Sequence, residues 1–285
     1  MAGPSNKLMT SSEPEPNPSD RLKALAMQAL PTRLLSQLTN RIARIKTPWI
    51  KNTLNRFFVC LYRIDLEQAV RHDPRDYESF NDLFTRALRP QARPLSTIPN
   101  SVVSPCDGTI SAIGQLSGDQ LIQAKGVTYP IAELMADLYN PELANGMFVT
   151  IYLSPSDYHR IHAPLRCSLE GCQHIPGRLL TVAASAVRAI PKLYVRNERL
   201  VTTWQTPVGP MALIPIGALN VGSIETAWDH QSSPDLAQGD EVGRFNLGST
   251  VIMILPQGTV DWNQALRATS RVLMGQSLGT INDNR

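Results

Sequence analysis

Cysteine is scarce in this sequence, and none of its four cysteines belongs to a CxxC pair. A chain of 285 residues is long enough to bury a core without a disulfide framework, which favours a reducing cytoplasmic setting. Cys167, Cys172 and His174 lie close together in the sequence, but no fourth ligand follows at the spacing of a zinc site. Buried or incidental thiols are therefore expected here, and no metal is predicted.

Long hydrophobic runs are missing as well. The longest weakly polar stretch, 211–224, contains Pro215 and Asn220 and falls short of the roughly 20 apolar residues that a membrane-spanning helix needs. The first residues are polar and acidic, unlike a secretory signal, so any contact with a membrane is expected to be peripheral. The glycine fingerprints of nucleotide-binding loops are also missing, so no nucleotide cofactor is predicted. No nucleic-acid partner is predicted either.

Acidic residues are missing from one long segment. Between Arg21 and Arg63 there are nine lysines or arginines and no aspartate or glutamate. Within this segment, apolar residues recur at spacings of three and four, which indicates an amphipathic helix that Pro48 ends or kinks. The apolar positions are Leu35, Leu38, Ile42, Ile45 and Trp49, and the cations among them are Arg33, Arg41, Arg44 and Lys46.

The pattern of this basic segment leaves two interpretations open. It suits the surface of an anionic bilayer, where apolar side chains enter the interface and each cation contributes about 1 kcal/mol. It equally suits a solvated helix that packs on the main domain or on a second subunit. Residues 1–20, ahead of it, carry four prolines, several serines and no apolar pattern, which predicts a disordered tail.

Beyond Pro94, short apolar segments alternate with glycine and proline, which is typical of a β-rich core. Helices are predicted at 77–88, after a turn and cap at 73–76, and also at 131–138 and near 181–190. The predicted fold class is α+β, with a mostly antiparallel β-rich core and an N-terminal basic amphipathic helical region. The segments expected to form strands are 109–113, 121–124, 147–153, 211–216 and 251–255.

Gly248, Ser249 and Thr250 stand at the start of the last apolar run. Glycine leaves its carbonyl open to approach and tolerates strained backbone angles, so a serine that follows it can attack its own backbone. A serine hydroxyl needs a base, usually a neutral imidazole held by a carboxylate, and Asp107 and His162 offer these groups. Taken singly, Gly-Ser-Thr and Asp-Gly are common turn sequences and a lone histidine is usually structural.

His159 and His162 lie three residues apart, beside Asp157 and Arg160. On a helix they would share a face and on a strand they would point in opposite directions, but the prolines at 155 and 164 favour a short loop or turn. Two histidines within such a charged segment raise the expectation of chemistry. Only the carboxylate, the imidazoles and the serine together indicate self-processing.

Three segments together resemble the bacterial phosphatidylserine decarboxylase family: 104–110, 152–164 and 243–250. The likeness extends over most of the chain, and the departures from it, such as cysteine at position 106 and a short connection at 227–243, do not affect the site. Further segments that carry it are Tyr77-Glu78-Ser79-Phe80-Asn81-Asp82-Leu83-Phe84, Gln123-Ala124-Lys125-Gly126, Arg196-Asn197-Glu198-Arg199 and Gly222-Ser223-Ile224-Glu225.

The resemblance implies a proenzyme that cuts itself between Gly248 and Ser249. Asp107 would stabilise protonated His162, His162 would activate Ser249, and Ser249 would attack the carbonyl of Gly248. Ser249 would then become a covalent pyruvoyl group, the pyruvate cofactor, which is the Schiff-base site and electron sink of the family. The products would be a heterodimer of a beta chain, 1–248, and an alpha chain, 249–285, with further dimerisation left open.

The implied reaction is the decarboxylation of phosphatidylserine to phosphatidylethanolamine in phospholipid biosynthesis, by a peripheral enzyme at the cytoplasmic face of the cell membrane. Residues 64–285 would be the decarboxylase domain, and 21–63 would contact the anionic membrane surface. His159 would bind the substrate head group or donate a proton to the product, whereas the segment 196–199 is as compatible with a structural ion-pair cluster as with a ligand site. Two alternatives remain: a pyruvoyl-dependent decarboxylase of a soluble amino acid, and a non-enzymatic module that binds anionic membranes.

Overall fold

The computed structural model describes residues 16–29, 32–124, 127–218, 224–229, 232–246 and 249–282. Most of the predicted tail lies outside this part of the chain. Helix α1 (Pro18–Ala29) already begins at Pro18, so the predicted boundary at residue 20 is slightly too late. Six residues of the segments that carry the family resemblance also lie outside the described residues. They are Lys125, Gly126, Gly222, Ser223, Leu247 and Gly248, the last of which precedes the predicted cut.

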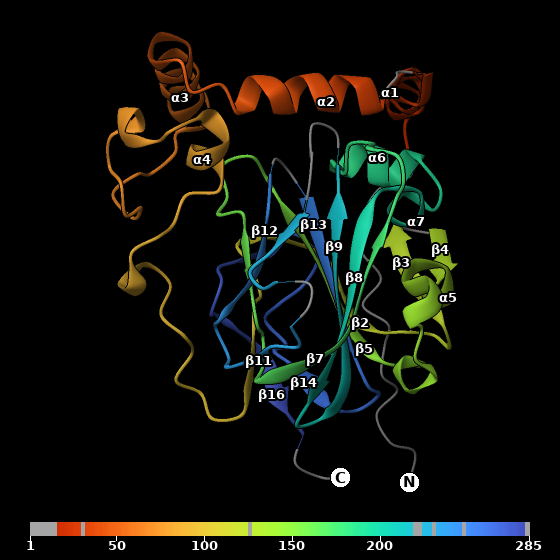
Figure 1. The fold of residues 1–285 in the computed structure, drawn as a ribbon. Coiled ribbons are helices and arrows are strands. Elements are labelled where there is room, and N and C mark those ends of the chain that lie inside the picture. Colours follow the sequence, from red (N-terminus) through yellow and green to blue (C-terminus); the bar gives the residue numbers. More distant parts are fainter. Residues whose placement is uncertain are drawn as a thin grey trace, which may run out of the picture.

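An antiparallel sheet of eight strands forms the centre of the fold, in the order β11-β7-β8-β9-β13-β5-β2-β15 (Figure 1). The predicted strands at 109–113, 147–153, 211–216 and 251–255 all lie in this sheet, which confirms the β-rich α+β class. Its strands are β2 (Gly108–Gln115), β5 (Met147–Leu153), β7 (Cys167–Ile175), β8 (Arg199–Thr206), β9 (Gly209–Gly217), β11 (Asp235–Leu236), β13 (Ser249–Leu255) and β15 (Arg271–Val272).

Three smaller antiparallel sheets surround the central one. The hairpin of β3 (Gln120–Ala124) and β4 (Val127–Pro130) contains the predicted strand at 121–124. The other two sheets have the orders β1-β16-β14 and β10-β12-β6. Their strands are β1 (Ser101–Val103), β14 (Val260–Trp262), β16 (Ser277–Ile281), β6 (Arg160–His162), β10 (Ile224–Thr226) and β12 (Glu241–Phe245).

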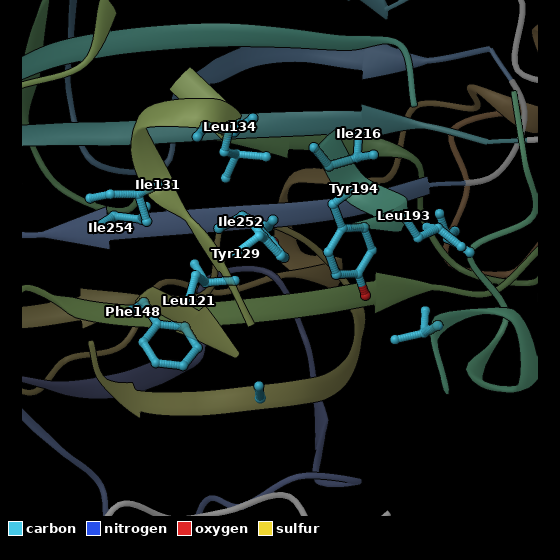
Figure 2. Packing of buried hydrophobic residues seen from close by; sticks show 14 of the residues in the cluster. Leu121, Tyr129, Ile131, Leu134, Phe148, Leu193, Tyr194, Ile216, Ile252 and Ile254 are labelled. Atoms are coloured by element: carbon cyan, nitrogen blue, oxygen red, sulfur yellow. The ribbon is translucent and has the colours of Figure 1, made fainter. Parts of the chain in front are cut away.

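Strand β13 contributes to two hydrophobic cores at once. Side chains alternate between the faces of a strand, so Ile252 and Ile254 enter one core while Val251, Met253 and Leu255 enter the other. All five are fully buried. Figure 2 shows the first core, where Ile252 and Ile254 lie among side chains from the β3–β4 hairpin and the helices beside it. Burial on both faces explains why this strand is a continuous apolar run.

The predicted apolar stripe, from Leu35 to Trp49, is divided between two helices rather than lying on one. Helix α2 (Thr32–Ala43) ends before Pro48, and Pro48 is the first residue of α3 (Pro48–Tyr62). Proline suits the first helical position because the missing N–H has no partner there and its φ is already helical. It also disfavours helical angles at the preceding residue, and Thr47 is indeed extended in ψ, at 119°.

The remaining helices are short. The predicted helices at 131–138 and near 181–190 are confirmed as α5 (Ile131–Met135), which a 3₁₀ turn extends, and α6 (Ala184–Ala189). The predicted helix at 77–88 is too long: α4 (Phe80–Phe84) starts at its Ser79 cap, and beyond it the chain extends until Leu88 bridges to Ala69. The others are α7 (Leu193–Arg196) and 3₁₀ turns at Pro74–Asp76, Pro90–Ala92, Ala136–Leu138 and Pro141–Leu143.

Candidate functional site

Ser249 is the first residue of β13, in the interior of the large sheet. Its backbone is paired on one side with Leu153, the last residue of β5, and on the other with Gly217, the last residue of β9. Helix α2 crosses beyond this end of the sheet, where β9 finishes (Figure 1). The side chain of Ser249 lies outside the described part of the structure, as Gly248 does. The neighbours of the strand end therefore define the site.

A tight turn follows Leu153 and leads to the first histidine. Asp157 closes this turn, because its Oδ2 accepts hydrogen bonds from the backbone N–H and the hydroxyl of Ser154, at 2.7 and 2.9 Å. The other carboxylate oxygen of Asp157 pairs with Arg271 from the far C-terminal part of the chain. The carbonyl of His159 accepts from the N–H of Phe245, at 3.0 Å, and so joins the turn to the chain that leads toward Ser249.

His159 is fully buried, and one of its imidazole nitrogens has no partner in the part of the chain that the structure describes. Its Nδ1 lies 2.9 Å from the carbonyl oxygen of Asp157, and because a carbonyl only accepts, Nδ1 carries the hydrogen. The ring packs on Phe84, with centroids 4.0 Å apart. Nε2 has no hydrogen-bond partner among the described residues. Burial lowers the pKa of His159 to about 3, so the ring is neutral and Nε2 presents a lone pair.

His162 has the same tautomer but a different neighbour at Nε2. Its Nδ1 donates to the carbonyl oxygen of Gly239, at 2.8 Å, and its Nε2 accepts from the hydroxyl of Tyr158, at 3.0 Å. Burial lowers the pKa of His162 and raises the pKa of Tyr158, so both remain neutral near pH 7. Both side chains line a cavity of about 350 Å³, beside Arg93 and Met274.

Asp107 lies just before β2 and is almost completely buried. Its carboxylate pairs with Arg93, with Nη2–Oδ2 at 2.5 Å and Nε–Oδ1 at 2.8 Å, and it also accepts from the backbone N–H of Met274, at 2.9 Å. Within the described residues, no hydrogen bond joins Asp107 to His162. The charge of Asp107 does favour protonated His162, but burial of His162 outweighs this effect on its pKa. Direct support of His162 by Asp107 stays a prediction.

Two further buried groups at this end of the sheet have unused hydrogen-bonding atoms. Arg86 is only 5% exposed and donates from Nη2 to the carbonyl of Ser156, at 3.0 Å, while its Nε and Nη1 have no partner in the described structure. The hydroxyl of Thr250, next to Ser249, is also buried without a partner there. The sequence shows Arg86 and Arg93 only as part of an arginine-rich stretch after a helix, so it gave them no role.

Comparisons with known proteins show the family to which the chain belongs. A family model described as phosphatidylserine decarboxylase matches residues 80–280, and a second, described as PSD, matches residues 22–63. The chain belongs to the phosphatidylserine decarboxylase family. The family resemblance expected from the sequence segments is thereby confirmed, and the matched region contains Asp107, His159, His162 and Ser249.

Relatives of this family are similar over nearly the whole chain. A protein of Halorhodospira halophila, named phosphatidylserine decarboxylase proenzyme, is 52% identical and covers 92% of this chain and 95% of its own length. Proteins with the same name from Alkalilimnicola ehrlichii and Nitrosococcus oceani are 43% and 42% identical. The first of these two alignments covers 82% of this chain and 88% of the relative, and the second covers 92% of each.

In the segment 196–199, which carries part of the family resemblance, two buried side chains bind backbone groups of neighbouring elements. Arg199 is buried and donates to the backbone carbonyls of Glu133, Leu134 and Val195. Asn197 is fully buried and binds the backbone of Leu180 and Gly217. These contacts tie α5, α7 and β9 together, so they favour the structural interpretation of this segment over a ligand site.

In the described ranges, the cysteines show no arrangement that points to a metal. Cys106 and Cys167 are buried, and burial raises the pKa of both thiols, for Cys167 to about 12. Among the residues that the structure describes, no group of three or more histidine, cysteine or acidic side chains is placed to hold a metal ion.

Proposed function

We propose that this protein is a proenzyme that cuts itself between Gly248 and Ser249 and then decarboxylates phosphatidylserine to phosphatidylethanolamine. Membership of the family supports the reaction and its lipid substrate. The structural observation that carries the proposal is the buried lone pair of His159, on the turn that leaves the strand end paired with Ser249. Polar contacts to a pyruvoyl group at position 249 would come from Nε2 of His159 and the hydroxyl of Thr250, which are both buried and have no partner among the described residues.

The cut needs only groups of the chain and water. The Ser249 hydroxyl gives its proton to an imidazole and bonds to the carbonyl carbon of Gly248, the peptide C–N bond breaks, and the freed amine takes a proton. The resulting ester is then eliminated: the α-proton of residue 249 leaves, and its Cβ–O bond breaks. Gly248 departs as a carboxylate that keeps the former serine oxygen. Water replaces the nitrogen of residue 249, which leaves as ammonia, and no external oxidant or reductant takes part.

We assign the base of the cut to His162, with Asp107 as its charge partner. In the structure the lone pair of His162 is engaged by the hydroxyl of Tyr158. This role therefore requires the hydroxyl to turn away so that Nε2 can accept the serine proton. Asp107 is held by Arg93 and Met274, so it acts on the imidazolium through its charge rather than through a hydrogen bond in the arrangement described.

His159 acts on the substrate in the decarboxylation. The pyruvoyl group, once formed, supplies a carbonyl that draws off the electron pair left behind by carbon dioxide. A histidine with a pKa of about 3 brings no proton of its own near pH 7. It instead accepts a hydrogen bond, which suits the amino group of the serine head group, whereas proton donation to the product carbon would require a higher pKa of His159 in the substrate complex. The Asp157 carbonyl and Phe84 fix its orientation.

The membrane surface is approached through α1, α2 and α3. These helices pack on the main domain by one side, through contacts such as Asp20–Arg188 and Phe58–Phe80. The predicted apolar stripe does not lie on the side that packs on the main domain, since Leu38 and Trp49 are 56% and 74% exposed. Other exposed apolar residues of these helices are Leu22, Leu25, Leu34, Leu35, Ile42, Phe57, Leu61 and Tyr62.

This apolar surface suits an anionic bilayer, because the surrounding segment 21–63 carries only cations. It lies at the same end of the sheet as Ser249, so a docked membrane presents its head groups close to the site (Figure 1). No helix in the described ranges has the length and apolarity to cross a bilayer. The division into a membrane-associating region, 21–63, and a decarboxylase domain, 64–285, is part of this proposal.

Denaturing gels and mass spectrometry of the purified protein test the self-cleavage. Wild-type protein should give two fragments, 1–248 and 249–285, and the smaller one should begin with a ketone that reacts with a hydrazine. Ser249→Ala should give one uncut chain, whereas Ser270→Ala, a control in the same fragment, should be cut normally. A single full-length wild-type band would contradict the proposal.

The substrate is tested separately, with the cleaved protein. Release of carbon dioxide should occur with phosphatidylserine in mixed micelles and should be at least about a hundredfold slower with free serine, because binding energy from the rest of the lipid is lost. Cleaved protein that prefers free serine would establish the soluble amino-acid decarboxylase instead.

A further inference from the structure

Asn246 is fully buried two residues before Gly248, and both ends of its carboxamide are held. Its Oδ1 accepts a hydrogen bond from Nδ2 of Asn81, at 2.9 Å, and its Nδ2 donates to Oε1 of Glu225, at 2.8 Å. Asn81 comes from α4, Glu225 from β10, and Asn246 directly follows β12. Three of the segments that carry the family resemblance therefore meet at this point, and none of these three side chains has a role in the chemistry described above.

The backbone on both sides of the predicted cut is fixed by pairing. On one side, Phe245 pairs with Ile224 of β10, and its N–H donates to the carbonyl of His159. On the other side, Ser249 pairs with Leu153 and Gly217. Only Leu247 and Gly248 connect Asn246 to Ser249. With so short a connection, the position of the Gly248 carbonyl depends directly on where Asn246 is held.

The orientation of the Asn246 carboxamide is determined by its partners. A carboxylate only accepts hydrogen bonds, so the NH₂ group of Asn246 must face Glu225, and its oxygen must face the NH₂ group of Asn81. Glu225 is in turn held by Arg44, the residue directly after α2, with Nη2–Oε1 at 3.3 Å. Side chains held at both ends with a fixed direction are a means of positioning a segment rather than of filling space.

We propose that Asn81, Asn246 and Glu225 form a clamp that positions the Gly248 carbonyl for attack by Ser249. The inference rests on the proposed self-cleavage. It makes these three residues positioning residues for maturation only, because the cut severs Gly248 from Ser249. After that, the clamp holds a free chain end and no longer controls where residue 249 lies. Loss of the clamp should slow the cut and leave the turnover of already cleaved enzyme unchanged.

Exchange of the donor and acceptor between Asn246 and Glu225 tests this directly. Asn246→Asp sets two carboxylates against each other, and loss of a hydrogen bond to a charged group should slow the cut at least about tenfold. Glu225→Gln alone keeps an acceptor oxygen and should cut within about threefold of the wild-type rate, on the scale of a neutral hydrogen bond. The double variant Asn246→Asp/Glu225→Gln restores one donor and one acceptor, and Asn81 still donates to the other oxygen, so its rate should recover.

The measurement is the first-order loss of full-length chain after synthesis, followed on denaturing gels, and then the decarboxylation rate per cleaved molecule. Asn55→Asp is the matched control, because Asn55 is equally buried on α3 and bonds to the carbonyl of Pro74, away from the cut. It should leave the cleavage rate unchanged. Melting temperatures in the uncut Ser249→Ala background should show that Asn246→Asp still folds.

Normal cleavage of Asn246→Asp would overturn the clamp, and so would a double variant as slow as the single one. If the decarboxylation rate per cleaved molecule falls as much as the cleavage rate does, the clamp does not act in maturation alone. Failure of the wild type to cut would instead contradict the proposed function, so the two failures are distinguishable.

Discussion

His159 and His162 show how two equal side chains in one short segment acquire different properties. Each gives its Nδ1 hydrogen to a backbone carbonyl, which fixes the tautomer and directs Nε2 away from the backbone. The hydroxyl of Tyr158 then occupies Nε2 of His162, whereas Nε2 of His159 has no partner in the described residues. A single hydroxyl thus separates a histidine with an available lone pair from one whose lone pair is engaged.

Replacement of Tyr158 tests whether its hydroxyl competes for the base. Tyr158→Phe frees Nε2 of His162, so self-cleavage should run at the wild-type rate or faster, measured by the loss of full-length chain over time. Tyr129→Phe is the matched control, because its hydroxyl is also buried but belongs to β4, under the other side of the sheet. A block of cleavage in Tyr158→Phe alone would show that the hydroxyl relays the proton to His162.

The sequence indicated candidate reactive residues but not their partners. Asp107, His159, His162 and Ser249 could be named because a carboxylate, imidazoles and a serine after glycine have recognisable chemistry. The pairing of Asp107 with Arg93 and the contact of His162 with Gly239 could not, because they depend on how distant loops pack. Buried atoms that have no partner among the described residues, such as Nε and Nη1 of Arg86, become visible only once burial is known.

At the scale of elements, apolar runs bounded by glycine and proline located the strands well. The runs at 147–153 and 251–255 match β5 and β13 almost residue for residue, since both are buried on two faces. Helix ends were less predictable. The helix predicted to reach Leu88 stops at Phe84, where the Thr85 hydroxyl bonds to the carbonyl of Asn81 and the chain turns to pair with Ala69. Tertiary pairing, which the local pattern does not contain, decides that end.

The exposed apolar side chains of α2 are expected to contribute to membrane binding. Leu34→Ser/Leu38→Ser should reduce binding to vesicles containing anionic lipid by about tenfold or more, since each removed side chain is worth about 1 kcal/mol or more at the interface. Cosedimentation measures this, and binding of the unaltered protein should weaken as salt rises. Ile98→Ser is the control, because Ile98 is similarly exposed but lies outside the three helices.

If this variant binds vesicles as well as the wild type does, the proposal that the exposed apolar side of α2 contacts the membrane is wrong. A change in oligomeric state without loss of vesicle binding would show that these helices contact a second subunit instead. The rate of self-cleavage should not change when Leu34 and Leu38 are replaced, because both lie on the exposed side of α2.

For the whole molecule, the two buried histidines link stability to pH. Folded His159 has a pKa of about 3, below its ordinary value of 6.5, and burial also lowers the pKa of His162. Below pH 6.5 the unfolded chain therefore binds protons that the folded chain does not, so stability falls as pH falls. Between pH 7.5 and 5.5 the free energy of unfolding should drop by about 1 kcal/mol for His159 alone.

Urea unfolding of the uncut Ser249→Ala protein at these two pH values measures the effect. In His159→Gln the drop should be smaller, because one of the two titrating groups is gone. An unchanged drop in this variant would mean that His159 is not the group responsible.

The position of β13 in the interior of the large sheet has a consequence for the proposed mature protein. After the proposed cut, the short alpha chain would contribute the strand between β9 and β5, whose apolar side chains enter both cores. Before the cut, the covalent connection keeps this strand at a high effective concentration near its neighbours. Afterwards refolding requires two separate molecules to meet, and its rate depends on their concentration. Each molecule can therefore fold as a single chain only before the cut.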